Sequence, residues 1–270
     1  MDHYRVYGNP IQQSKSPIIH QAFAIQTNQK ICYEKELVQP DEFEQTVRAF
    51  IDKGGKGANV TAPFKEQACQ LCTQLSERAK LSGAVNTLTF NKDEIFGDNT
   101  DGVGLVQDLL SHQVVLKDKN ILLLGAGGAA KGVVASLIAQ QPELLVIANR
   151  TVAKAQLIVD QYPQANIRSC SFEEISAFDF DIIINATSAG LTGDKLPISD
   201  QAITANTVCY DMVYGKTLTP FLQLAQSLGA KKVIDGLGML VGQAAESFFI
   251  WRRVKPQTED IMQQLRIELS

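Results

Sequence analysis

The chain has 270 residues, of which 45% are hydrophobic and 20% are charged, and its formal net charge is −4. This length predicts about two domains, and the composition is typical of globular proteins rather than of fibrous or disordered chains. The charge is mildly negative and the 25 Lys and Arg residues are scattered along the chain. The composition therefore gives no indication of a nucleic-acid partner.

The N-terminal stretch Met1–Val6 lacks the basic-then-apolar pattern of a secretory signal. No apolar run approaches the ~20 residues that a membrane span needs. The five cysteines do not have the spacing of a secreted disulfide framework. Together these features predict a cytoplasmic protein with no membrane partner.

The N-terminal part of the chain alternates between short strands and helices, which predicts an α/β domain with a mostly parallel sheet. One helix is expected to begin at Ser16-Pro17, with Ser16 as its N-cap and Pro17 at its first position. Further helices are expected from Asp41 to Ile51 and from Pro63 onward. The expected strands are Tyr4–Gly8, Cys32–Leu37 and Gly57–Val60, followed by a hairpin of Val85–Phe90 and Glu94–Gly97.

Cys69 and Cys72 form a C-x-x-C motif, which needs a second pair of Cys or His residues to make a zinc site. No such pair accompanies it, so we predict no metal. The motif lies in an expected helix from Lys65 to Gln74, where both thiols are interpreted as small apolar residues. The three histidines show no chemical pattern and are interpreted as surface or packing residues: His3, His20 and His112.

A glycine-rich turn, Gly125-Ala126-Gly127-Gly128-Ala129-Ala130, follows an apolar strand and precedes an alanine-rich helical stretch. In this setting glycines make a tight turn and let a pyrophosphate approach the N-terminus of a helix. Six strands with intervening helices predict a complete Rossmann sheet. The expected strands are Ile121–Leu124, Leu144–Ala148, Ile167–Cys170, Asp181–Ala186, Val208–Met212 and Lys232–Ile234.

Arg150 stands at the end of the second of these strands, where an NAD site would place Asp or Glu for the ribose 2′-hydroxyl. Lys154 follows about one helical turn later. Cations at this position suit a 2′-phosphate, so the predicted cofactor is NADP(H). The alternative interpretation is a tight strand-to-helix turn with a solvated arginine behind it.

The predicted fold class is therefore α/β, with two domains and an active site in the cleft between them. A substrate-binding, catalytic domain is expected to comprise residues 1–103 and 238–270, and an NADP-binding Rossmann domain residues 104–237. The two last helices, Met239–Arg253 and Thr258–Leu269, are expected to return to the catalytic domain.

A nicotinamide domain moves hydride, and reduction of a ketone also needs a proton donor near the forming alkoxide. The Tyr-x-x-x-Lys pattern of short-chain reductases is absent, as are zinc ligands. The acid is therefore expected in the N-terminal domain. Two polar stretches there are candidates, Asn59–Lys65 and Gly97–Gly102.

These stretches are part of a set of motifs that resembles the shikimate dehydrogenase family, in order and over nearly the whole chain. The resemblance implies NADP-dependent, reversible reduction of 3-dehydroshikimate to shikimate, a step of chorismate and aromatic amino acid biosynthesis. The motifs are Gly8–Ile11 with Ser14–Pro17, Asn59–Lys65, Gly83–Thr87, Asn99–Gly104, Asn185–Ser188, and Asp235–Leu240 with Gln243.

The resemblance implies roles for individual residues. Lys65 and Asp101 match the family's catalytic pair, and the sequence leaves open which member carries the proton. Ser14 and Ser16 match hydroxyls that bind the substrate carboxylate, although Ser16 as an N-cap alone is the alternative. Asn59, Thr61, Asn86 and Gln243 match groups that hold ring hydroxyls, and Tyr214 matches a substrate-side tyrosine. The expected cofactor-binding residues are Gly125, Gly127, Gly128, Ala129, Asn149, Arg150, Thr151, Lys154, Thr187, Ser188, Met212 and Gly236. Of these, Met212 and Gly236 match family residues near the nicotinamide.

One departure from the family pattern lies after Tyr214. Relatives often carry Tyr-x-Pro-x-x-Thr-Pro, whereas this chain has Lys216 at the first proline position. The loop is therefore less restricted in φ.

Two other functions compete with the leading hypothesis. A quinate/shikimate dehydrogenase using NAD would be expected to carry an acidic residue near Arg150, and none is present. A non-catalytic NADPH-binding regulator on the same fold would tolerate loss of Lys65 and Asp101, but both are present. The sequence does not distinguish a monomer from a homodimer, and substrate is expected to favour closure of the two domains.

Overall fold

The computed structural model describes residues 1–92, 94–187, 196 and 198–269. Its contacts divide the chain into two compact units, Met1–Gly104 with Leu240–Leu265, and Leu105–Met239 with Arg266–Ser270. The predicted boundaries lie within two residues of these. The division differs from the prediction after Leu265, because the Arg266 guanidinium donates to both carboxylate oxygens of Asp235 in the second unit.

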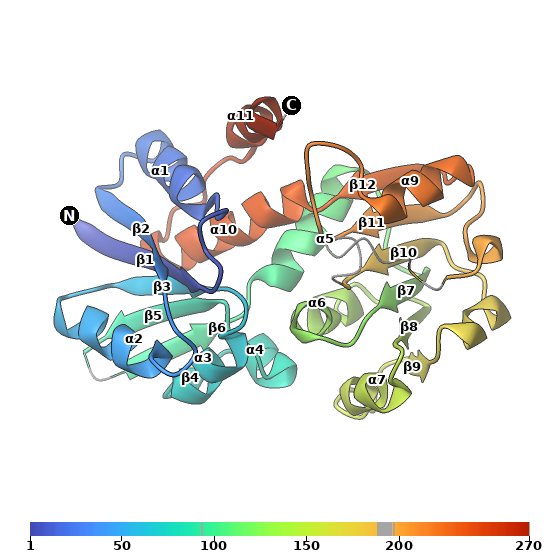
Figure 1. Cartoon of the computed structure of the whole chain (residues 1–270), viewed down its shortest axis with the longest axis horizontal. Helices are drawn as coiled ribbons and strands as arrows, with labels where there is room; N and C mark the ends of the chain where they lie inside the picture. Colours follow the sequence, from blue (N-terminus) through green and yellow to red (C-terminus); the bar gives the residue numbers. More distant parts are fainter. Residues whose placement is uncertain (93, 188–195, 197, 270) are drawn as a thin grey trace. The chain divides into compact units, whose positions relative to one another are not determined.

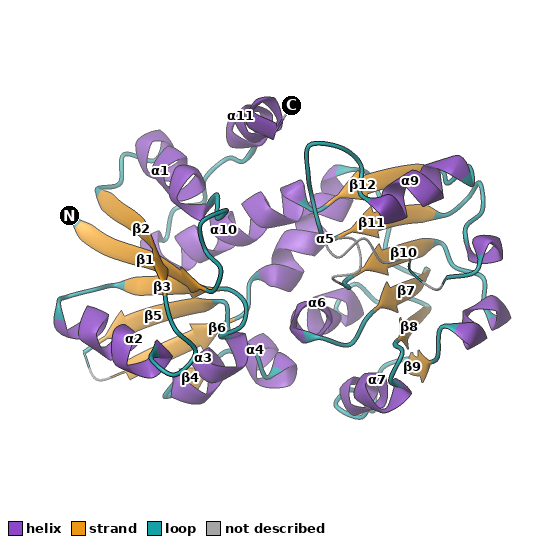
Figure 2. Ribbon diagram, viewed as in Figure 1, coloured by secondary structure: helices purple, strands orange, loops and turns teal. Residues whose placement is uncertain are grey.

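The N-terminal unit contains a six-stranded sheet of order β2-β1-β3-β5-β6-β4 (Figure 2). β1 pairs in parallel with β2 and β3, and β4 pairs in parallel with β6. The hairpin of β5 and β6 is antiparallel, as is its junction with β3, so the sheet is mixed. The strands are β1 Asp2–Gly8, β2 Ile31–Leu37, β3 Gly57–Val60, β4 Gln74–Leu75, β5 Thr87–Asn91 and β6 Glu94–Asp98.

Helices cover both faces of this sheet (Figure 1). On one face Phe43, Val47 and Phe50 pack with buried sheet residues in a single apolar cluster. On the other face Phe23 and Phe248 contact each other with ring centroids 5.7 Å apart. The first face is covered by α2 Phe43–Asp52, α3 Lys65–Leu71 and α4 Glu77–Ser82, and the second by α1 Ser16–Gln26 and α10 Leu237–Arg252.

Two local predictions for this unit are wrong. The N-cap of α1 is Lys15, without a side-chain cap, and Ser16 is already helical. The Ser14 hydroxyl instead accepts a hydrogen bond from the Ser16 backbone N–H at 3.3 Å. The expected helix 65–74 ends at Leu71 because Thr73 N–H donates to the Ile95 carbonyl, which draws the chain into a strand beside β6.

The second unit is a six-stranded, wholly parallel sheet of order β12-β11-β10-β7-β8-β9. This is the doubly wound order of a Rossmann fold, and it confirms the predicted sheet. Apolar clusters lie on both faces, one including α6 residues and the other α9 residues. The strands are β7 Asn120–Leu124, β8 Leu144–Ala148, β9 Ile167–Cys170, β10 Ile182–Asn185, β11 Val208–Asp211 and β12 Lys232–Asp235.

The described residues form further helices. They are α5 Asp101–Ser111, α6 Gly128–Ile138, α7 Val152–Val159 and α9 Pro220–Ser227, the 3₁₀ helices η1 Glu173–Ala177 and η2 Asp200–Ala202, and the C-terminal α11 Glu259–Leu269. No helix within the described residues is both long and apolar enough to cross a membrane.

His20 on α1 is completely buried and stacks on Tyr33, with ring centroids 4.1 Å apart and an interplanar angle of 6°. Burial lowers the pKa of His20 to about 3. The imidazole is thus a neutral member of an aromatic cluster that also contains Phe248 and Trp251. This outcome agrees with its interpretation as a packing residue.

We expect His20 to make the protein less stable as the pH falls below the pKa of an unfolded histidine, ~6.5. Below that pH the imidazole of His20 is protonated in the unfolded chain but stays neutral in the folded chain. The free energy of unfolding therefore decreases by about 2 kcal/mol between pH 6.5 and 5. Urea denaturation at both pH values measures this. The His20→Phe variant should lose that part of the dependence, whereas His3→Phe, at an exposed position, should keep it. Equal pH dependence in wild type and His20→Phe would contradict the assignment.

Candidate functional site

The glycine turn lies at the carboxyl end of β7, where α6 begins. Gly125 adopts a φ of +106°, which side chains other than glycine rarely tolerate. A Cβ atom at Gly127 or Gly128 would meet no atom within 4 Å, so the backbone there faces open space. Gly127 is the N-cap of α6, an 11-residue helix with no acidic residue in its first turn. These features fit the pyrophosphate of a dinucleotide; Ala129 follows in the same first turn.

Arg150 and Lys154 lie beside this turn. β7 and β8 end at the same level, with Leu124 paired to Ala148, and Gly125 N–H donates to the Ala148 carbonyl at 2.8 Å. Asn149 stabilises the start of α7 by donating to the Thr151 carbonyl at 2.8 Å. Arg150 and Lys154 are exposed, and neither side chain has a hydrogen bond or ion pair to another residue of the described chain. Both cations are therefore available for a 2′-phosphate.

The remaining expected cofactor residues follow β10, β11 and β12. Thr187 donates its hydroxyl to Asn185 Oδ1 at 2.7 Å, whereas Ser188 lies outside the described residues. A Cβ on Gly236 would lie 2.2 Å from the carbonyl oxygen of Met212, so only glycine fits there. Because these segments leave parallel strands at their carboxyl ends, they lie at the edge where α/β sheets bind ligands.

In the N-terminal unit, Lys65 and Asp101 form the closest polar pair among the expected site residues. Lys65 is the first residue of α3 and Asp101 the first of α5. Lys65 Nζ lies 2.5 Å from Asp101 Oδ2, and the side chains are 22% and 8% exposed. The carboxylate is thus buried, while the ammonium retains access to solvent. This is a proton-donating group held in a fixed orientation by a charged partner.

Asn86 connects this pair to other expected substrate residues. Its Nδ2 donates to the second Asp101 oxygen, Oδ1, at 2.7 Å and approaches Gln243 Oε1 at 3.4 Å. Its Oδ1 accepts from the backbone N–H of Thr100 at 2.9 Å. Asn86 is nearly completely buried. Asn86 therefore orients Asp101 and positions Gln243, which itself donates to the Leu240 carbonyl one turn earlier on α10.

A partly buried ion cluster stabilises the segment that leads to Asp101. The Arg78 guanidinium donates to both Asp98 oxygens at 2.7 and 2.8 Å and to Glu246 at 3.2 Å. Asp98 Oδ1 accepts from the Asn99 N–H at 2.7 Å, and the Asn99 side chain accepts from the Asp101 N–H at 3.1 Å. Arg78 thus helps to fix Asp101 through two intermediate residues. Sequence analysis did not identify Arg78, because its partners are remote along the chain.

Asn59 is less available to a ligand than its expected role requires. Its Nδ2 donates to the Asn86 carbonyl and to Ser247 Oγ, both at 3.0 Å, and its Oδ1 accepts from the Tyr33 hydroxyl at 2.7 Å. The side chain is buried. In this structure Asn59 therefore holds β3 to β5 and α10, and its predicted contact with a ring hydroxyl stays a prediction.

The other expected substrate residues lie on separate segments. In the N-terminal unit Ser14 is half-buried in the turn before α1, Ser16 is buried on α1, and Thr61 is half-buried after β3, near Lys65 in the chain. Tyr214 belongs to the second unit and is half-buried. Burial, assisted by the Asp235 carboxylate, raises the pKa of Tyr214, so its hydroxyl is a neutral hydrogen-bonding group.

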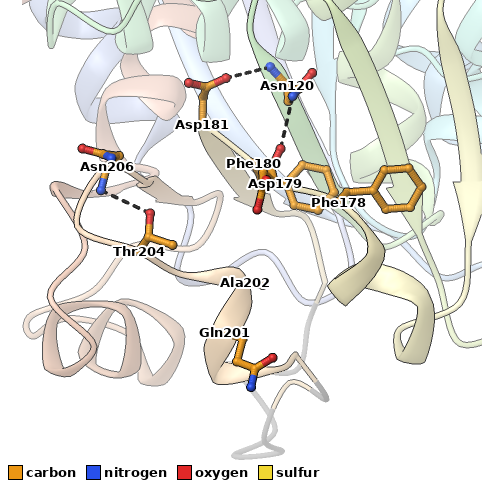
Figure 3. Close-up of a pocket in the computed structure, with 9 residues that line it drawn as sticks. All are labelled: Asn120, Phe178, Asp179, Phe180, Asp181, Gln201, Ala202, Thr204 and Asn206. Atoms are coloured by element: carbon orange, nitrogen blue, oxygen red, sulfur yellow. Dashed lines mark hydrogen bonds between the residues drawn. The ribbon is translucent and has the colours of Figure 1, made fainter.

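A polar pocket of about 460 Å³ lies in the second unit but contains none of these residues (Figure 3). Asn120 begins β7 and Asp181 directly precedes β10, so the pocket is at the amino end of the sheet. The Lys119 ammonium forms an ion pair with the Asp181 carboxylate at 2.9 Å and compensates the negative charge of that carboxylate. Dinucleotides bind at the opposite, carboxyl end of such sheets, and this pocket is therefore not the candidate cofactor site.

Comparison with known proteins assigns these features to one family. Residues 6–88 match the model of the shikimate dehydrogenase substrate binding domain, residues 106–194 that of shikimate/quinate 5-dehydrogenase, and residues 236–266 that of the shikimate 5′-dehydrogenase C-terminal domain. The chain belongs to the shikimate dehydrogenase family. The resemblance seen in the sequence motifs is thereby confirmed.

Individual relatives of this shikimate dehydrogenase family member agree over the full length. The NADP(+) shikimate dehydrogenase of Colwellia psychrerythraea is 55% identical over 269 residues, covering 100% of this chain and 98% of the relative. The crystal structure of an Ael1 enzyme from Pseudomonas putida matches with 42% identity and a TM-score of 0.95, covering 100% of both chains. The shikimate 5-dehydrogenase of Thermus thermophilus, solved with NADP(H) and shikimate, is 27% identical with a TM-score of 0.89, again covering 100% of both chains.

Proposed function

We propose that this protein catalyses the reversible, NADPH-dependent reduction of 3-dehydroshikimate to shikimate. The observation that carries the proposal is the Lys65–Asp101 pair, 2.5 Å apart and buried on its acidic side, in a chain of the shikimate dehydrogenase family. The C3 carbonyl of the substrate gains a hydride and a proton. This reaction places the protein in chorismate and aromatic amino acid biosynthesis.

Lys65 is the member of the pair that contacts the reacting oxygen in this proposal. Its ammonium is more exposed than the Asp101 carboxylate, 22% against 8%, so a ligand reaches Lys65 first. Lys65 gives a proton to the C3 oxygen during reduction and recovers one during oxidation of shikimate. Asp101, held by Asn86, keeps the Lys65 ammonium oriented.

The other expected site residues hold the substrate and cofactor. Ser14 and Ser16 offer hydroxyl donors to the carboxylate, while Thr61, Asn86, Gln243 and Tyr214 offer polar groups to the ring hydroxyls. When bound, NADPH supplies the hydride and NADP⁺ accepts it in reverse. The backbone at Gly125–Gly128 suits the pyrophosphate and Arg150 with Lys154 the 2′-phosphate, as their open surroundings support.

Partners beyond these small molecules are not part of the proposal. Monomer and homodimer both remain compatible with the proposed reaction.

The test is the formation of reduced nicotinamide, followed by its absorbance, when purified protein is given shikimate and either NADP or NAD. We expect rapid formation with shikimate and NADP, and a higher kcat/KM for NADP than for NAD. Quinate in place of shikimate tests the competing quinate dehydrogenase activity. Absence of turnover with shikimate, while NADPH still binds, would overturn the proposal in favour of a non-catalytic NADPH-binding protein.

A further inference from the structure

Asp211 is a completely buried carboxylate at the carboxyl end of β11. Its Oδ1 accepts from the backbone N–H of Val213 at 3.0 Å, and its Oδ2 accepts from the Thr219 hydroxyl at 2.5 Å. Val213 and Thr219 are the two ends of the loop that carries Tyr214. One carboxylate therefore closes this loop from both sides.

The same carboxylate also reaches the segment after β10. Asn185 Nδ2 donates to Asp211 Oδ1 at 3.2 Å. The opposite end of the Asn185 amide, Oδ1, accepts from the N–H and the hydroxyl of Thr187 at 3.0 and 2.7 Å. Asp211 thus orients Asn185, and Asn185 orients Thr187. Two segments that carry expected cofactor-binding residues, Thr187 after β10 and Met212 after β11, depend on one side chain.

A third segment packs against the first residues of this loop. Gly236, which follows β12, donates its N–H to the Val213 carbonyl at 3.2 Å. Its Cα is so close to Met212 that a Cβ would lie 2.2 Å from the carbonyl oxygen. The position of Met212 is therefore defined on one side by the backbone of Gly236 and on the other by the hydrogen bond from Val213 to Asp211.

The chemistry of Asp211 favours a positioning role over a stabilising one. All of its hydrogen-bond donors are neutral, and no Lys, Arg or His of the described chain pairs with it. Burial raises its pKa, because a buried carboxylate without a cation is costly. The loop lacks the proline that often stands at the position of Lys216 in relatives, so its conformation depends more on these hydrogen bonds.

We propose that Asp211 is a positioning residue for the nicotinamide half of NADP(H). Its carboxylate fixes the backbone at Met212 and Val213 and, through Asn185, the side chain of Thr187. Without it these groups lose their common anchor, while Arg150, which follows β8 and belongs to another segment, is unaffected. The inference rests on the proposed NADP-dependent function and adds a residue that touches neither substrate nor cofactor.

The test compares binding of the whole cofactor with binding of its adenine half. Asp211→Asn retains the size of the side chain but replaces an accepting oxygen by an NH₂ group. Dissociation constants are measured for NADPH and for adenosine 2′,5′-bisphosphate, together with kcat. We expect about 10- to 100-fold lower kcat and weaker NADPH binding, with the affinity for adenosine 2′,5′-bisphosphate unchanged. A purely structural role would weaken both ligands equally.

Asp108→Asn is the matched control. Asp108 is likewise a buried carboxylate of this unit, but it accepts from the Tyr210 hydroxyl at 2.7 Å and contacts none of the loop ends. The Asp108→Asn variant should bind NADPH and adenosine 2′,5′-bisphosphate as tightly as the wild type. Equal weakening of both ligands by Asp211→Asn, or no change in either, would overturn the inference.

A second pair of variants covers the case in which Asp211→Asn does not fold. Thr219→Val removes one donor to the carboxylate, whereas Thr219→Ser retains the hydroxyl that caps α9. The valine variant should show the same selective loss for NADPH, and the serine variant should restore it. These binding measurements do not require turnover. An inactive wild type would thus overturn the proposed function without deciding the role of Asp211.

Discussion

The Lys65→Met variant should lose about 10²- to 10⁴-fold in kcat for shikimate oxidation while binding NADPH as tightly as the wild type. General acid–base groups contribute rate factors of this size. Methionine keeps an unbranched side chain at the start of α3 but cannot hold a proton. The expected cofactor-binding residues belong to the other unit, so we expect the NADPH affinity to stay unchanged. Steady-state kinetics with shikimate, and fluorescence titration with NADPH, measure the two quantities.

Lys80→Met is the control for removing a lysine from this unit. Lys80 pairs with Glu77 at 2.6 Å on the exposed surface of α4, and both side chains are largely accessible. Such pairs contribute little to stability, and kcat should remain at the wild-type value. Because Lys65→Met leaves the buried Asp101 without its cation, its urea denaturation midpoint must be measured as well. A folded Lys65→Met protein with wild-type kcat would refute the proton-transfer role.

The Rossmann unit was predictable because its sequence signals are local and consistent. Most of its strands are short apolar runs, and the glycine turn and Arg150 follow two of them at fixed spacing. The parallel order of all six strands then follows from the family of folds that such a pattern permits. For the described strands of this unit, the local sequence preference and the observed secondary structure agree.

Two local predictions in the N-terminal unit were wrong, one because of a contact with a remote segment and the other because of a contact with a neighbouring residue. The sequence 65–74 is a plausible helix, yet Thr73 pairs with Ile95 and ends it early. Ser16 has the side chain of an N-cap, yet Ser14 supplies the hydroxyl that accepts the Ser16 N–H. Local propensity is a weak prior against a tertiary contact such as that between Thr73 and Ile95.

The candidate site shows the same division. Lys65, Asp101 and Asn86 are found by motif and lie together. The ion cluster that holds the segment before Asp101 was not predictable. Its members Arg78, Asp98 and Glu246 come from α4, β6 and α10, and their positions in the sequence follow no recognisable spacing. A polar residue that acts through other residues leaves no motif of its own. Its role becomes apparent only when the hydrogen bonds are known.

Arg150→Ser should reverse the preference for cofactor. Arg150 is exposed beside the glycine turn and has no partner elsewhere in the described chain. Its guanidinium is therefore not consumed by the fold, and its removal should leave stability unchanged. Loss of one charge-assisted contact corresponds to about 10- to 100-fold in kcat/KM for NADP. The kcat/KM for NAD, which has no 2′-phosphate, should stay constant or rise.

The control for this change is Arg168→Ser, which removes an exposed arginine on β9 of the same sheet. It alters the net charge equally but lies away from the glycine turn, so the NADP-to-NAD ratio should remain that of the wild type. Raising the ionic strength should weaken NADP binding in the wild type more than in Arg150→Ser, because salt screens an exposed cation–phosphate contact. If Arg150→Ser and Arg168→Ser gave equal ratios, Lys154 alone would have to select the 2′-phosphate, and the importance of Arg150 would be refuted.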